Sequence, residues 1–325
     1  MTVPNLFEEF EKQRILIIGD IMLDSYLWGS VDRISPEAPV PIVHVKKREQ
    51  RLGGAANVAL NIQSLGATPI LCSVVGNDVE GKSLLSLIES HGLSSEGIVV
   101  LEDRPTTVKQ RIISGSQHML RVDSETAQPI DPDQSLSLFT KLKPLLLQCQ
   151  AVIFEDYDKG VITPELIQKV VSLANQKGIP TIVDPKKRNF LAYENVTLFK
   201  PNLKELKEGL KIDFNKADQE EVKKAALLLR EKMNIRISLI TLSEHGVFIS
   251  DGQDEHFLPA HVRSISDVSG AGDTVVSVAA LTLALGLPLK KIASFSNLAG
   301  GIVCEEIGVV PIKKERLKAE LEEIF

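Results

Sequence analysis

Short apolar runs rich in β-branched residues alternate with amphipathic segments along most of the chain. The runs with the length of buried strands are residues 14–18, 70–75, 151–154, 181–183, 197–199 and 238–241. The segments with helical spacing of apolar residues are 55–65, 81–91, 134–147, 164–177 and 216–233. This alternation predicts an α/β fold with a mostly parallel sheet and helices on both faces. In such a sheet ligands bind beyond the carboxyl ends of the strands, where most of the polar motifs fall.

Two segments interrupt the alternation and read as extended chain outside the main sheet. Residues 26–46 contain the run Pro39-Val40-Pro41-Ile42-Val43-His44-Val45, and residues 97–122 contain the alternating run 107–113. We expect these segments to form a small β lid over the carboxyl edge of the sheet, with plain surface loops as the alternative. We further expect residues 1–325 to be one domain that includes this lid.

Composition narrows the function classes. A net charge of −6 over 325 residues, without a basic stripe, argues against a nucleic-acid partner. Three widely separated cysteines, with no metal-type spacing, fit a reducing cytoplasm. The acidic, amphipathic start of the chain does not resemble a signal peptide. The apolar run 275–289 is interrupted by Gly286 and Pro288, so we interpret it as a buried helix and expect no membrane span.

One phosphate-binding motif is present only formally. Residues 76–83, Gly-Asn-Asp-Val-Glu-Gly-Lys-Ser, satisfy the P-loop pattern GxxxxGK[ST] between a strand and a helix. A P-loop wraps backbone N–H groups around a phosphate, and the charges of Asp78 and Glu80 would repel that anion. We therefore interpret the segment as a turn with an acidic first helical turn, and keep a P-loop nucleotidase as an alternative.

A second glycine-rich segment is better suited to phosphoryl transfer. Residues 267–274, Asp-Val-Ser-Gly-Ala-Gly-Asp-Thr, precede an apolar helix predicted over 275–285. Small residues allow close approach of the backbone, and N–H groups at a helix start favour negative charge. We therefore predict an anion hole for a transferring phosphoryl group, formed by the backbone at Gly270, Ala271 and Gly272. Asp273 would stand beside it and accept a proton from the attacking hydroxyl, unless it only caps the helix.

Together with three further motifs, this segment resembles the ribokinase-like (PfkB) carbohydrate kinases over nearly the whole chain. The other motifs are Gly53-Gly54-Ala55-Ala56-Asn57, Pro201-Asn202-Leu203-Lys204-Glu205 and Thr241-Leu242-Ser243-Glu244-His245-Gly246. The late segment matches the family element D-T-x-G-A-G-D except at Val268. The resemblance implies a three-layer α/β/α fold with a β lid. It also implies transfer of the γ-phosphoryl group of ATP, with Mg²⁺, to a sugar hydroxyl.

A narrower resemblance concerns the substrate. Residues 19–24, 33–41, 53–61, 156–160 and 184–186 resemble the D-glycero-β-D-manno-heptose-7-phosphate kinases. Those enzymes phosphorylate the anomeric C1 hydroxyl and make the 1,7-bisphosphate on the route to ADP-heptose and lipopolysaccharide. Their kinase part is often fused to a nucleotidyltransferase domain with an HxGH motif. The sequence contains no HxGH, so we expect a kinase without a nucleotidyltransferase domain.

By this resemblance, sugar hydroxyls would be held by Asp24, Gly53, Gly54 and Asn57, whose polar groups suit a polyol. A 7-phosphate also needs fixed positive charge, for which the candidates are Arg111, Arg121, Lys186 and Lys187. Arginine would clamp a phosphate through two hydrogen bonds, whereas lysine acts as a point charge. Lys186, which follows an Asp-Pro turn at a strand end, is the preferred candidate, and solvated lid charges are the alternative for the arginines.

The resemblance also assigns the nucleotide side. Asn202 and Glu205 match an N-x-x-E element that organises Mg²⁺ through water, in keeping with the oxygen ligands that this ion prefers; helix capping is the alternative. Contacts to ATP would come from Thr241, Ser243, Gly246 and Asn297. A structural K⁺ would lie at Asp267 and Ser269.

These interpretations leave rivals open. The substrate could be another sugar, sugar phosphate or nucleoside, or the chain could be a non-catalytic sugar-binding protein of the same fold. An exposed β lid favours edge pairing between two copies, so we expect a homodimer.

Overall fold

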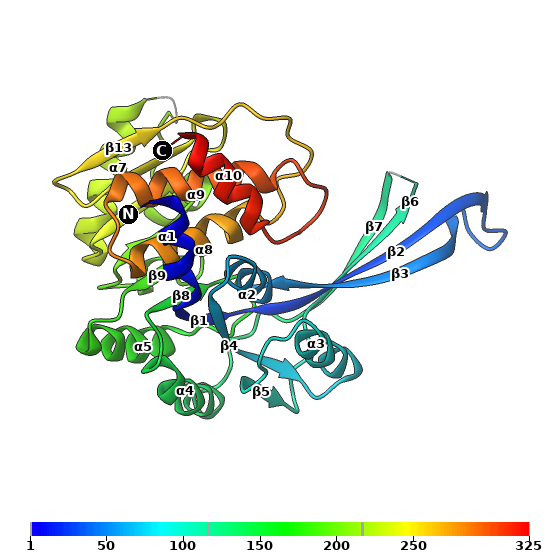
Figure 1. Cartoon of the computed structure of the whole chain (residues 1–325). Helices are drawn as coiled ribbons and strands as arrows, with labels where there is room; N and C mark the ends of the chain where they lie inside the picture. The colour runs from blue at the N-terminus through cyan, green and yellow to red at the C-terminus, as the bar shows by residue number, and fades with distance from the viewer. Residues whose placement is uncertain (1, 116, 216–217, 325) are drawn as a thin grey trace.

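The computed structural model describes residues 2–115, 117–215 and 218–324, which form two β-sheets with helices around the larger one (Figure 1). The strands of the larger sheet, sheet A, are β1 (Arg14–Gly19), β4 (Thr68–Gly76), β5 (Gly97–Leu101), β8 (Ala151–Glu155), β9 (Thr181–Asp184), β10 (Leu198–Phe199), β11 (Ile237–Thr241), β12 (Val247–Ser250) and β13 (Glu255–Leu258). Their order is β13-β12-β11-β10-β9-β8-β1-β4-β5. Only the β11–β12 and β12–β13 pairings are antiparallel among these described strands. The predicted mostly parallel sheet is confirmed.

Helices cover both faces of sheet A. They are α1 (Val3–Glu11), α2 (Ala55–Ser64), α3 (Val79–Ser90), α4 (Pro132–Leu146), α5 (Pro164–Lys177), α6 (Leu203–Leu210), α7 (Gln219–Met233), α8 (Ala271–Ala284), α9 (Leu289–Val303) and α10 (Lys314–Ile324). Alternate residues of β1 show the two layers, because Ile15 and Ile17 pack in the core with α2 and α8. Leu16 and Ile18 point to the opposite core, with α4, α5 and α7. The expected three-layer α/β/α architecture is thereby confirmed.

The predicted helices match α2, α3, α4, α5 and α7 within a few residues, although the predicted start of the last, Lys216, lies outside the described residues. The apolar run 275–289 forms most of the buried helix α8, as predicted, and reaches the first residue of α9. Gly286 has a φ of 65° after α8, and Pro288 caps α9. In the described part of the chain, no helix combines the length and apolar character needed to cross a bilayer.

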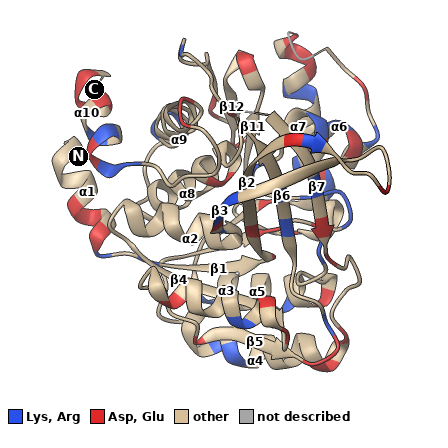
Figure 2. Ribbon diagram, turned by 90° about the vertical axis from the view of Figure 1, so that its right-hand side faces the viewer, with Lys and Arg blue, Asp and Glu red and all other residues tan. Residues whose placement is uncertain are grey.

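The smaller sheet, sheet B, consists of β2 (Ile21–Ile34), β3 (Pro41–Gly54), β6 (Val108–Ser114) and β7 (Gln117–Ser124), in the order β3-β2-β6-β7. It projects from the body as a long arm (Figure 1). Both signs of charge are distributed along its strands (Figure 2). Its base is β2 and β3, which run directly into the site described below.

One boundary of the expected lid is wrong. Residues 97–101 form β5, the edge strand of sheet A, with Gly97 in register with Cys72 of β4. The physical reason is burial, because Ile98 and Leu101 face the two cores. Sheet B therefore draws its second hairpin from residues 108–124, of which residue 116 lies outside the described residues.

Candidate active site

Charged side chains converge where the central strands of sheet A end. Glu155 closes β8 and lies in register between Gly19 of β1 and Asp184 of β9. Lys200 follows β10, and its Nζ lies 2.9 Å from Asp184 Oδ2, with both side chains buried. This carboxyl edge is where the parallel sheet predicts a ligand.

The start of α8 lies against this edge. Gly270 caps the helix with a φ of 79°, a left-handed conformation that favours glycine. A Cβ at Gly272 would lie 3.5 Å from Asp184 Oδ2 and 3.7 Å from Lys200 Nζ. The Ala271 N–H, one of the donors expected in the anion hole, instead points to the Val268 carbonyl at 3.3 Å. The N–H groups of the following first-turn residues have no acceptor within a helix and suit an anion.

Asp273 lies in this first turn and is buried. Its Oδ2 accepts a hydrogen bond from Asn57 Nδ2 at 2.6 Å, and its Oδ1 accepts one from the Tyr157 hydroxyl at 2.8 Å. Burial raises the pKa of Asp273 to about 6, while the bonds from Asn57 and Tyr157 act in the opposite direction. Asp273 is therefore ionised at neutral pH, with a pKa close enough to the working pH for a general base.

The expected sugar-binding residues gather beside Asp273. Gly54 has a φ of 61° and ends β3 at the N-cap of α2, so Asn57 stands in the first turn of that helix. A Cβ at Gly53 would collide with Asp24 Oδ2, which shows how closely that carboxylate approaches the β3 backbone. The structure thus brings together Asp24, Gly53, Gly54 and Asn57, drawn from β2, β3 and α2.

Two arginines flank this group, one of them unexpected. Arg111 of β6 donates to Asp24 Oδ1, and its guanidinium lies 5.3 Å from the Tyr26 ring centre. Arg51 of β3 approaches the same ring at 5.0 Å. Arg51 escaped the sequence analysis because its position depends on the β2–β3 register, which pairs it with Asp24.

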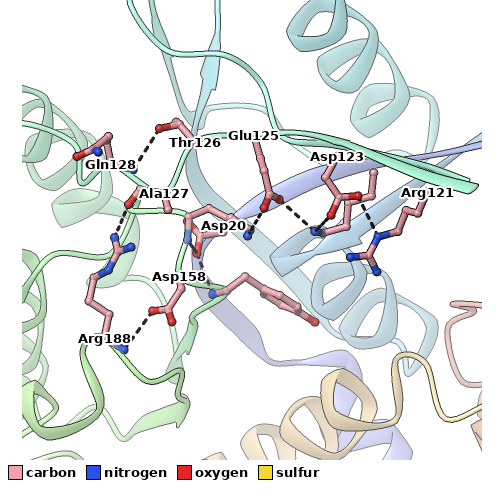
Figure 3. Close-up of polar contacts among 12 residues, drawn as sticks. Asp20, Arg121, Asp123, Glu125, Thr126, Ala127, Gln128, Asp158 and Arg188 are labelled. Carbon is pink, nitrogen blue, oxygen red and sulfur yellow. Dashed lines mark hydrogen bonds and ion pairs between the residues drawn. The ribbon is translucent and has the colours of Figure 1, made fainter.

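Arg121 has a different environment. It pairs in register with Arg111, but its side chain is 59% exposed and its Nε lies 3.0 Å from Asp123 Oδ1 (Figure 3). The chain leaves sheet B just beyond it, where Glu125 binds Lys109 at 3.1 Å and Lys159 at 2.7 Å (Figure 3). These ion pairs tie the end of sheet B to the loop that follows β8.

Lys186 pairs with carboxylates from β9 and α6 and lies near Tyr157. Its Nζ is 2.6 Å from Glu205 Oε1 and 3.9 Å from Asp184 Oδ1, and it stands 5.4 Å from the Tyr157 ring centre. Glu155 lies below this group with both carboxyl oxygens unpartnered in the described structure. Burial, then the charges of Asp184 and Asp273, raise the pKa of Glu155 well above its ordinary value.

Asn202 and Glu205 form a reciprocal capping box at the start of α6. Glu205 N–H donates to Asn202 Oδ1, and Asn202 N–H donates to Glu205 Oε2, each at 2.8 Å. Capping and a ligand role are compatible, since Glu205 Oε1 turns towards Lys186. A β-bridge joins Asn202 to Thr241 at the end of β11.

The remaining expected nucleotide contacts lie further along the same edge. Ser243, with a φ of 54°, and Gly246, with a φ of 87°, shape the turn between β11 and β12. A Cβ at Gly246 would collide with the Leu258 carbonyl, so this position requires glycine. Asn297 of α9 donates to the Pro259 carbonyl at 2.8 Å.

Asp267 and Ser269 shape the approach to α8. Asp267 accepts hydrogen bonds from the N–H groups of Ser269 at 2.9 Å and Gly308 at 3.0 Å. Across the described residues, no group of three or more His, Cys, Asp or Glu side chains is arranged to hold a metal. The donors present still fit Mg²⁺ that arrives with a nucleotide, because this ion uses one or two carboxylates, phosphates and water.

The formal P-loop is a turn. Asp78 caps α3, and its Oδ1 accepts the Gly81 N–H at 2.6 Å, a group that a P-loop would present to phosphate. Its Oδ2 accepts the Thr106 N–H at 2.8 Å.

A cavity of about 840 Å³ lies between α5 and residues 192–195. None of the residues that line it belongs to the group around Asp273.

Residues 12–315 match the sequence model of the pfkB family of carbohydrate kinases. The chain belongs to this family. It is a carbohydrate kinase, as expected from the motifs. Bifunctional protein HldE of Wolinella succinogenes is 41% identical to this pfkB kinase over 294 residues, which cover 90% of the chain and 61% of that protein. HldE of Methylobacillus flagellatus is 40% identical over 309 residues, which cover 95% and 63%. The chain thus spans less than two thirds of the length of these relatives.

Solved structures confirm the ribokinase-like fold. Phosphofructokinase-2 from Escherichia coli in complex with potassium superposes with a TM-score of 0.76, at 20% identity, over 95% of this chain and 99% of that chain. Arabidopsis thaliana ribokinase complexed with ribose and ATP gives a TM-score of 0.74, at 15% identity, over 96% and 99%.

Proposed function

We propose that this pfkB kinase transfers the γ-phosphoryl group of ATP to the anomeric C1 hydroxyl of D-glycero-β-D-manno-heptose 7-phosphate. The product would be the 1,7-bisphosphate used for ADP-heptose and lipopolysaccharide synthesis. The relatives named HldE support a heptose substrate, as do the motifs shared with heptose-7-phosphate kinases. The observation that carries the reaction type is the position of Asp273, which lies in the first turn of α8 and is hydrogen-bonded to Asn57 of the proposed sugar-binding group.

The proposed step is a direct displacement. Asp273 Oδ1 accepts the proton of the C1 hydroxyl as that oxygen forms a bond to the γ-phosphorus. The bond from the γ-phosphorus to the β–γ bridging oxygen breaks, and its electron pair leaves with ADP. N–H groups in the first turn of α8 and Lys200 stabilise the charge of the transferring group. Such catalysis consists of positioning and electrostatics.

We assign the residues near the nucleotide phosphates from the resemblance to the family. Asn202 and Glu205 would hold Mg²⁺ through water, and bound Mg²⁺ would neutralise phosphate charge. Thr241, Ser243, Gly246 and Asn297 would line the remainder of the ATP site. Asp267 and Ser269 would hold a structural K⁺.

Of the cations proposed for the 7-phosphate, Arg111 is the best placed, because it contacts Asp24 beside the sugar-binding glycines. Arg121, its neighbour in register, would join when the arm closes over the substrate. Lys186 lies with Asp184 and Glu205, a placement that favours the phosphates of ATP over that of the sugar.

We also propose a homodimer formed through sheet B. Leu120 and Val122 of the edge strand β7 are 56% and 46% exposed, which favours pairing with a second copy. Light scattering coupled to size exclusion tests this assembly, and a monomer at micromolar concentration would refute it.

An ADP-release assay with D-glycero-D-manno-heptose 7-phosphate beside fructose 6-phosphate, ribose and adenosine tests the substrate. We expect the heptose phosphate to give the highest kcat/KM. A higher value for another acceptor would replace the proposed substrate and leave the kinase assignment intact.

A further inference from the structure

Tyr157 contacts Asp273, the candidate base, and also lies close to Lys186. Its hydroxyl donates to Asp273 Oδ1 at 2.8 Å, and its ring lies 5.4 Å from Lys186 Nζ. The residue belongs to the loop after β8, and nothing in the motif analysis assigned it a role.

The loop that carries Tyr157 is held rigidly. Asp20, buried at the end of β1, accepts the N–H groups of Tyr157 at 2.8 Å, Lys159 at 3.1 Å and Val161 at 3.1 Å. Three hydrogen bonds to one buried carboxylate fix the backbone from which the tyrosine extends. The phenol is therefore presented to Asp273 by a fixed support.

Two donors on different oxygens define the plane of the Asp273 carboxylate. Asn57 of α2 donates to Oδ2, and Tyr157 of the loop after β8 donates to Oδ1. A carboxylate oxygen has more than one lone-pair direction, so Oδ1 can accept from Tyr157 and from a sugar hydroxyl at the same time. The Tyr157 proton stays on the phenol while Asp273 takes the proton of the substrate.

We propose that Tyr157 is a positioning residue for phosphoryl transfer, which orients Asp273 Oδ1 towards the acceptor hydroxyl and stabilises its ionised form. This inference rests on the proposed role of Asp273 as the base. It does not depend on which sugar is the substrate.

Several charged groups around Asp273 act on the same ionisation. Glu155 at the end of β8 and Asp184 at the end of β9 oppose a negative charge on Asp273. Lys200 after β10 favours it, and Lys186 Nζ stands 5.4 Å from the centre of the Tyr157 ring. Tyr157 differs from these groups because it is a neutral donor in direct contact with Oδ1.

The test compares Tyr157→Phe with Tyr193→Phe, each in the full chain. Tyr193 is a matched control, since its hydroxyl donates to Asp156 Oδ2 at 2.8 Å beside the same loop and has no bond to Asp273. In Tyr157→Phe we expect kcat at pH 8 to fall about tenfold and the acid limb of the kcat profile to move up by about one pH unit, the scale of a hydrogen bond to a charged group. KM for ATP should stay unchanged. Tyr193→Phe should leave the acid limb in place.

A ¹³C NMR titration of the Asp273 carboxyl carbon supplies a readout apart from activity, and the same upward shift is expected. An unmoved acid limb and titration in Tyr157→Phe would overturn the inference, as would equal shifts in the two variants. Adding Tyr157→Phe to Asp273→Asn should cost nothing more, and a full further tenfold loss would also overturn it. If Asp273→Asn alone keeps its turnover, the proposed base itself fails, which is a different result.

Discussion

Asn57 and Asp273 are hydrogen-bonded at 2.6 Å although 216 positions separate them in the chain. Each stands in the first turn of a helix, α2 for Asn57 and α8 for Asp273, and the two helices pack together on one face of sheet A. The contact places a sugar-binding motif and a phosphoryl-transfer motif at the two ends of one hydrogen bond. With the roles proposed above, this bond would hold the acceptor and the base in fixed relation.

The pH dependence of turnover should report Asp273. Because burial raises its pKa to about 6, kcat should fall as the pH drops through 6, well above the range of an exposed aspartate near 4. The measurement is kcat at saturating ATP and sugar phosphate between pH 5 and pH 8.5. At both extremes of pH, a control checks that full activity returns when the enzyme is brought back to neutral pH. An acid limb near pH 4 would contradict the assigned environment of this carboxylate.

Asp273→Asn should also stabilise the fold at neutral pH. Because burial raises the pKa of Asp273 from 3.8 to about 6, the buried charge costs up to about 3 kcal/mol above pH 6. This cost is absent below the unfolded pKa near 4, where the carboxyl is protonated in both states. We therefore expect a gain of about 1–3 kcal/mol in the free energy of unfolding at pH 7.5 that disappears towards pH 4. A loss of stability at pH 7.5 in urea unfolding would show that the charge is not strained.

Gly53→Ala should damage sugar binding selectively. The new Cβ would collide with Asp24 Oδ2 and displace that carboxylate from its place beside Arg111. KM for the sugar phosphate should rise at least about tenfold, the loss of one charge-assisted hydrogen bond, while KM for ATP stays the same. Gly178→Ala, at the end of α5, is the control for a general loss of stability, because its φ of 68° strains an alanine although the new Cβ meets no neighbouring atom, and it should leave both KM values unchanged. An equal rise of the two KM values in Gly53→Ala would point to a general distortion.

Lys82→Ala should be almost silent in turnover. Lys82 is exposed on α3. The Asp78 carboxylate already accepts the Gly81 N–H, which a P-loop would offer to phosphate. Asp78→Ala should instead cost about 1–2 kcal/mol of stability through the lost helix cap, with kcat retained. Loss of activity in Lys82→Ala would support the alternative that residues 76–83 form a P-loop.

Local pattern was sufficient for much of the fold. Strand–helix alternation predicted the central strands and five helices, because each strand has a strongly apolar run that ends in polar residues. The assignment of residues 97–101 failed because Gly-Ile-Val-Val-Leu is equally suited to either sheet, and only its pairing with β4 shows which one it joins.

The site was predictable as far as motifs reach. Asp273, Asn57 and the paired glycines lie in recognisable segments, and the structure brings them together. Tyr157 and Lys200 were missed because their roles depend on strand order, which sets β8, β9 and β10 side by side. No local spacing encodes that order, so contacts across it require the folded structure.

The central claim is that Asp273 accepts the proton of the sugar hydroxyl during phosphoryl transfer. The direct measurement is kcat for Asp273→Asn by ADP release at saturating sugar phosphate and ATP, with a folded variant verified by circular dichroism. The account predicts a fall of roughly two to four orders of magnitude with KM for ATP unchanged, the range of a lost general base. Turnover within a few-fold of the unsubstituted enzyme would contradict it.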